Sequence, residues 1–185
     1  MVLLTPATAG AEWQFKPFFG ATFAGETTLI DLESAAGQVH SAVGVSTLLI
    51  GEMLGIEADF GVAPGFFSAG GNYVVRSSVT TVTANVVIAM PQRLTQYTLR
   101  PYFVGGGGLL HARSELFLDP LPVASTRPAM DIGGGVTGFL TPRLGLNWDV
   151  RYFHSLGSGE ADKGLSIGPE RLSFWRATMA LTIRR

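Results

Sequence analysis

The sequence predicts an all-β fold: a closed, eight-stranded, antiparallel up-and-down barrel whose strands cross a membrane. Three observations support this prediction. Apolar and polar residues alternate along eight segments, as is typical of strands with two different faces. The connections between these segments alternate between long and short. Hydrophobic residues make up 46% of the chain and charged residues only 15%, well below the roughly one quarter found in soluble domains.

Composition also excludes several classes of protein. No run of about 18 apolar residues occurs, so a transmembrane helix is not predicted. The apolar excess must therefore lie in a core or on one face of alternating strands. The net charge of -1 gives no support for a nucleic-acid partner. The absence of cysteine excludes disulfide bonds and metal–thiolate sites.

The alternation is clearest in the segment from Arg143 to His154. Its apolar face comprises Leu144, Leu146, Trp148, Val150 and Tyr152, and its polar face comprises Arg143, Gly145, Asn147, Asp149 and Arg151. Asp149 and Arg151 are two residues apart, so both project to the same side of a strand and can pair. Sparse charges of opposite sign suit the narrow interior of a barrel. The apolar face then contacts lipid.

Seven further segments are predicted as strands. In chain order they are Trp13–Ala24, Gln38–Leu49, Gly55–Phe66, Ser78–Met90, Leu99–Arg113, Ala129–Leu140 and Arg171–Arg184. The predicted long connections are 25–37, 67–77, 114–128 and 155–170, and the short ones are 51–55, 91–98 and 141–143. Membrane barrels have short turns on the periplasmic side and longer loops outside. Such a barrel must close, because an open sheet edge in lipid leaves backbone groups unpaired.

Two segments bear on the choice between a membrane barrel and other proteins. Ser78–Met90 contains no charged residue, whereas a soluble, lipocalin-like barrel would need a hydrated outer face there. Gly105–Gly108 is a run of four glycines, which weakens a strand but permits tight curvature inside a small barrel. A phosphate-binding loop is not predicted, because the required spacing and the following helix are both missing.

The N-terminal residues Met1–Ala11 are similar to the end of a secretory signal peptide. Ala7-Thr8-Ala9 or Ala9-Gly10-Ala11 would be its small-residue cleavage pattern. The basic region and most of the apolar region of such a signal are missing, so a flexible N-terminus is the alternative. In either case residues 12–185 are expected to form the barrel domain.

Several glycine-rich and aromatic motifs resemble the eight-stranded bacterial outer-membrane β-barrel family, with an architecture like that of OmpA and OmpX. They are Tyr102–Leu109, Gly133–Gly135 with Leu140–Gly145, Asp149–Tyr152 and Phe174–Arg176. The resemblance implies a monomer in the outer membrane that contacts lipid, lipopolysaccharide and the barrel-insertion machinery, without a cofactor. The chain differs from the family in ending on Ile183-Arg184-Arg185 instead of an aromatic residue.

Strand alternation predicts which side chains lie inside and which lie at the membrane interfaces. Seven charged residues are expected in the lumen: Lys16, Glu57, Asp59, Asp131, Asp149, Arg151 and Arg176. Buried charge without a partner is costly, so a plug of ion pairs is the main expectation. A proton or ion path, or a small-solute pore, is the alternative. The expected interface aromatics are Trp13, Tyr102, Trp148, Tyr152 and Trp175.

An enzymatic alternative depends on His154, Ser155 and Glu160. These residues resemble the triad of outer-membrane lipid A deacylases, in which a His and a Ser two residues apart project to the same side. Here the two are adjacent, so a regular strand directs them to opposite faces, and Leu156 stands where the nucleophile should be.

No metal site is predicted, because His40, His111 and His154 lie on three separate strands. The main expectation for function is a non-enzymatic outer-membrane protein with a structural or loop-mediated role. A lipid A-modifying enzyme and a small-solute pore remain as alternatives.

Overall fold

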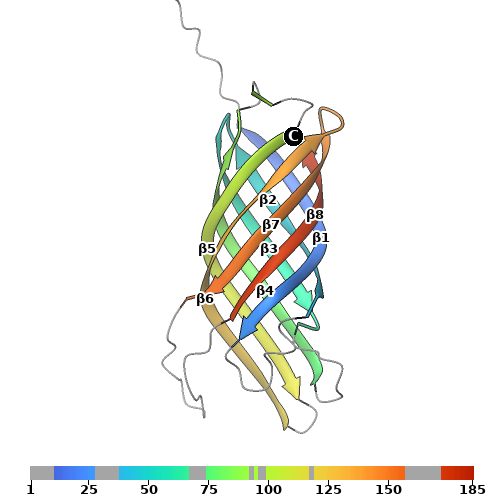
Figure 1. The fold of residues 1–185 in the computed structure, drawn as a ribbon, viewed down its shortest axis with the longest axis vertical. Coiled ribbons are helices and arrows are strands. Elements are labelled where there is room, and N and C mark those ends of the chain that lie inside the picture. The colour runs from blue at the N-terminus through green and yellow to red at the C-terminus, as the bar shows by residue number, and fades with distance from the viewer. Residues whose placement is uncertain are drawn as a thin grey trace, which may run out of the picture.

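A computed structural model describes residues 11–27, 38–66, 74–91, 94–95, 99–116, 119–156 and 172–185. It contains eight strands: β1 Glu12–Thr27, β2 His40–Ile50, β3 Leu54–Pro64, β4 Val74–Ala89, β5 Leu99–Leu116, β6 Asp119–Phe139, β7 Leu144–Ser155 and β8 Leu172–Arg184. Each strand pairs with the next along the chain, and β8 pairs with β1 (Figure 1). The predicted closed, antiparallel, eight-stranded barrel is confirmed. Within the described ranges no helix is long and apolar enough to cross a membrane.

The barrel closes along the antiparallel pair of β1 and β8. Their register runs from Gln14 opposite Arg184 to Thr27 opposite Leu172, with an irregularity between Phe23 and Glu26. Ala24 lies in this irregularity with a φ of 48°, a left-handed conformation that suits a β-bulge. Because every strand has two neighbours, the backbone donors and acceptors at membrane depth can be satisfied internally.

The two faces of the strands differ in the way that the alternation predicts. At mid-height on β4, Thr81 points inward and is 4% exposed, whereas its neighbour Val82 points outward and is 49% exposed. The exterior carries a continuous set of large apolar side chains, among them Phe19 on β1, Phe60 on β3 and Ile132 on β6. An exposed apolar surface of this extent marks a membrane-facing surface rather than a hydrated one.

The expected long connection over residues 114–128 is wrong. β5 continues to Leu116 and β6 already begins at Asp119, so only residues 117–118 connect the two strands. The register of β6 with β7 begins at Ala129 opposite Ser155. The residues of β6 that precede Ala129 pair with β5 in the described chain. Prolines are tolerated on such a strand edge, and Pro120, Pro122 and Pro128 give this strand the composition of a loop.

Candidate functional site

The structure places all seven of the expected lumenal charges inside the barrel, and each is at most 4% exposed. The cations are Lys16 from β1, Arg151 from β7 and Arg176 from β8, and the carboxylates are Glu57 and Asp59 from β3, Asp131 from β6 and Asp149 from β7. Seven charges from five strands therefore share one confined space. Three cations face four carboxylates, so the set carries one surplus carboxylate.

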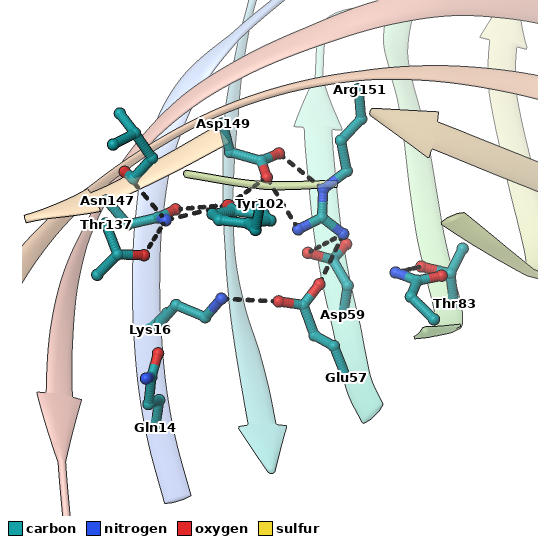
Figure 2. Close-up of polar contacts among 12 residues, drawn as sticks. Gln14, Lys16, Glu57, Asp59, Thr83, Tyr102, Thr137, Asn147, Asp149 and Arg151 are labelled. Atoms are coloured by element: carbon teal, nitrogen blue, oxygen red, sulfur yellow. Dashed lines mark hydrogen bonds and ion pairs between the residues drawn. The ribbon is translucent and has the colours of Figure 1, made fainter. Parts of the chain in front are cut away.

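Arg151 is the centre of this network (Figure 2). Its Nε and Nη2 donate to the two oxygens of Asp149 at 2.6 and 3.1 Å, a bidentate arrangement of the strong kind. Its Nη1 lies 2.7 Å from Glu57 Oε1, 3.9 Å from Asp59 and 3.7 Å from Asp131. One guanidinium thus connects the carboxylates of three strands.

The other two cations extend the network to both sides of Arg151. Lys16 Nζ donates to Glu57 Oε2 at 2.8 Å. Arg176 Nη2 donates to Asp59 Oδ1 at 2.8 Å, and its guanidinium carbon lies 4.7 Å from the ring centroids of both Phe18 and Phe153. Cations are stabilised by aromatic faces at this distance, particularly when water is excluded.

Tyr102 was expected at a membrane interface, and this assignment is wrong. It lies in the lumen at 6% exposure, where its hydroxyl donates to Asp149 Oδ2 at 2.6 Å and accepts from Asn147 Nδ2 at 3.0 Å. The same Asn147 nitrogen donates to Thr137 Oγ1 at 2.9 Å. The alternation Leu99, Pro101, Phe103 outward and Arg100, Tyr102, Val104 inward was the sequence signal that could have placed it.

Space for Tyr102 comes from a glycine on the next strand. A Cβ at Gly135 of β6 would lie 2.6 Å from the Tyr102 hydroxyl and 2.8 Å from its ring. The same Cβ would also clash with the backbone carbonyl of Trp148 on β7, so a larger residue would disturb the β6–β7 pair as well as the Tyr102 phenol. The sequence predicted tight curvature at Gly105–Gly108 of β5, and the structure shows that Gly135 of β6 also permits a close approach.

The remaining expected interface aromatics lie on the exterior. Trp13, Trp148 and Trp175 are each at least 40% exposed, and Tyr152 packs beside Trp175 with ring centroids 5.2 Å apart. Apart from Tyr102, these residues occupy the lipid-facing side.

Two apolar layers enclose the charges along the barrel axis. The layer at the loop end comprises Ala63, Phe66, Val79, Leu110, Ala129, Phe153, Leu172 and Phe174. The layer at the short-turn end comprises Leu48, Ile50, Val87, Ala89, Tyr102 and Val104. Two cavities in the lumen, beside Arg176 and beside Gln14, each hold only about 10 Å³, about the minimum for a single water. Around these two cavities the described side chains fill the interior, as an eight-stranded barrel allows.

Of the residues of the enzymatic alternative, the structure describes His154 and Ser155, and it does not bring these two side chains together. His154 lies on the outer face, where its ring stacks on Tyr152 at 6.3 Å. Ser155 points inward, is 4% exposed, and its Oγ accepts the backbone N–H of Leu172 at 2.9 Å. Glu160 lies outside the described residues. Among the residues that the structure describes, no group of His, Asp or Glu has the geometry of a metal site.

An apolar exterior around a closed, polar and tightly packed interior defines a transmembrane β-barrel. Comparison with solved structures gives the same class. The chain matches Neisserial surface protein A at 15% identity, covering 92% of this chain and 97% of that one with a TM-score of 0.61. It also matches the outer membrane protein OprG of Pseudomonas aeruginosa at 13% identity, with coverages of 96% and 97% and a TM-score of 0.60.

A third match is the N-terminal β-barrel domain of Pseudomonas aeruginosa OprF, at 13% identity, with coverages of 95% and 100% and a TM-score of 0.56. No sequence-family model matches the chain, and neither does any curated protein. The chain therefore has the fold of the eight-stranded bacterial outer-membrane β-barrels, as the sequence motifs indicated.

Proposed function

We propose that this chain is a non-enzymatic, non-conducting integral protein of the bacterial outer membrane. The packed lumen is the observation that carries the proposal. Its charges pair with one another between two apolar layers, so a permeating ion would have to displace buried salt bridges and then cross apolar packing. Lipid and lipopolysaccharide are the partners of the exterior, and the barrel-insertion machinery is the partner during assembly of the monomer.

The interaction role is assigned to the loop end of the barrel. There the β5–β6 hairpin extends past the start of the β6–β7 register at Ala129 (Figure 1). A structural neighbour at 12% identity, with coverages of 94% and 99% and a TM-score of 0.54, is the attachment invasion locus protein Ail of Yersinia pestis, solved in complex with a heparin analogue. That protein presents a precedent for ligand binding by a barrel of this fold.

The proposal predicts an electrically silent barrel. Purified protein reconstituted in a planar lipid bilayer should give no stepwise conductance in potassium chloride, whereas a large porin in the same bilayer should. Folding of the inserted protein is checked by its faster migration on a gel when it is not boiled. Reproducible unitary steps from the folded protein would contradict the closed lumen and favour a small-solute pore.

The proposal also predicts that lipid A is not modified. Because His154 and Ser155 lie on opposite faces of β7, neither can activate the other for attack on an acyl chain. Mass spectra of lipid A from cells with and without the protein should be identical. Loss of one acyl chain only in cells that express the parent protein, and not the Ser155→Ala variant, would establish the enzyme instead.

A further inference from the structure

The barrel opens at its short-turn end into a cleft of about 480 Å³ that is separate from the ion pairs of the lumen. It is lined by Arg100 and Arg184, by Phe139 and Thr95, and by the turn residues 140–142. Arg100 lines both this cleft and the lumenal cavity beside Gln14, which holds only about 10 Å³. The passage from the cleft toward the lumenal charges is therefore narrow.

Arg100 is a buried cation whose bonds go to uncharged groups. Arg100 is 4% exposed. Its Nε donates to the carbonyl of Met90 at 3.0 Å, and its Nη2 donates to those of Gly51 and Glu52 at 3.2 and 2.7 Å. These bonds fix the guanidinium rigidly between two turns. These carbonyl oxygens accept from Nε and Nη2, so Nη1 is the nitrogen that can donate to a ligand. The carbonyls carry no formal charge to balance the guanidinium.

Arg184 is a second fixed guanidinium in the same cleft. Its Nε donates to the Pro142 carbonyl at 2.8 Å, and its Nη1 lies 3.2 Å from Glu12 Oε2. Its guanidinium carbon lies 4.5 Å from the centre of the Phe139 ring. Unlike the lumenal cations, Arg184 keeps a quarter of its side chain exposed, at 25%, so a ligand that enters from the aqueous side can reach it.

Among the described residues around this cleft, the two guanidiniums do not both have a carboxylate partner. Glu12 pairs with Arg184 at 3.2 Å, whereas the hydrogen bonds of Arg100 go to backbone carbonyls. Glu12 is also bonded to Gln14 at 2.7 Å. Thr141 Oγ1 accepts the backbone N–H groups of Arg143 and Leu144 at 3.3 and 2.9 Å, which leaves its own hydroxyl hydrogen available as a donor.

We propose that the cleft binds a phosphate group between Arg100 and Arg184, with the Thr141 hydroxyl as a further donor. Rigid planar guanidiniums match the oxygens of phosphate and bind it through charge-assisted hydrogen bonds. Such a ligand would supply negative charge beside Arg100, whose hydrogen bonds in the described chain go to uncharged carbonyl groups. The phosphate group comes either from a lipid headgroup of the adjacent leaflet or from free phosphate in the compartment.

The test is an NMR titration of the folded barrel. Sodium phosphate is added to isotope-labelled protein in uncharged detergent, and the Arg Nε–H signals and turn amides are followed against sodium chloride at equal ionic strength. In a parallel arm, nanodiscs of phosphatidylcholine with and without phosphatidic acid replace the detergent. Saturable shifts with phosphate identify the free anion as a ligand, and shifts confined to the phosphatidic acid arm identify the lipid headgroup.

Variants separate a specific site from general attraction. Arg184→Gln should weaken binding about tenfold or more, because one charge-assisted contact is lost, and Arg100→Lys should weaken it by removing the fixed fork. Arg143→Gln is the matched control, since that exposed arginine lies on the same rim but outside the cleft, and it should bind like the parent. Each variant is compared only after its unboiled gel migration shows a folded barrel. The proposal would be overturned if phosphate gave shifts no larger than chloride and phosphatidic acid gave no shifts in the nanodiscs. Unchanged binding by Arg184→Gln would also overturn it.

Discussion

Replacement of Arg151 by Met is expected to lower the free energy of unfolding by about 3–5 kcal/mol, the cost of removing one partner from a buried ion pair. Arg151 holds Asp149 by two bonds and Glu57 by a 2.7 Å contact. Without Arg151, six of the seven charges remain: the cations Lys16 and Arg176 and four carboxylates. Reversible urea unfolding from detergent or lipid measures the loss.

Two companion variants show whether the loss comes from stranded charge. The double variant Asp149→Asn/Arg151→Met removes both members of the bidentate pair, so it should recover part of the loss, with a coupling of about 1–3 kcal/mol. Asp131→Asn is the matched control, because Asp131 lies no closer than 3.7 Å to the Arg151 nitrogen that it faces and one lumenal carboxylate is in surplus. Its cost should be about 1 kcal/mol or less.

A coupling near zero between Asp149 and Arg151 would contradict the sealed lumen. It would show that water screens these charges, as it screens surface ion pairs. The small-solute pore would then be the better proposal, and the conductance measurement should give a signal in the same protein.

Replacement of Val82 by Arg is the second large effect, expected to cost about 2–4 kcal/mol, the price of a cation that faces lipid at the membrane midplane. Val82 points outward at mid-height on β4, where it lies opposite Phe60 of β3 and Leu109 of β5. The matched control is Leu144→Arg, also outward but at the short-turn end of β7, where the expected cost is about 0–1 kcal/mol.

These two variants are compared in phospholipid vesicles by urea unfolding, with the heat-dependent gel shift as the check of folding. Equal costs at the two depths, or no cost at either, would show that the outer face is hydrated and that the barrel does not lie in a bilayer.

The sequence already predicted most of the fold and the contents of the lumen. Alternation along Leu144–Ser155 separated Trp148 and Val150 from Asp149 and Arg151 correctly, because the direction of a side chain in a strand depends on the parity of its position alone. The same reasoning assigned the seven charges of the Arg151 network to the inside, but it did not assign Arg100, which is also buried. It failed at Tyr102, where the expectation of an interface aromatic was given more weight than the parity of Arg100, Tyr102 and Val104.

The contacts within the site could not be predicted in this way. Arg151 bonds to Glu57, which is far from it along the chain and on a strand that does not pair with β7. That contact depends on the barrel radius and on the register of every intervening strand. The rim arginines were missed for a related reason, since Arg100 meets the carbonyls of Gly51 and Glu52 only after two separate turns come together.

The sequence by itself determined the number of strands, their two faces and the sign of the charge on each lumenal side chain, because these are local properties of short segments. Only the tertiary structure decided where β5 and β6 end, which carboxylate meets which cation, and that Gly135 makes room for Tyr102. These features depend on closure and register, which bring residues from distant strands to within a few ångströms. Alternation carries no information about either.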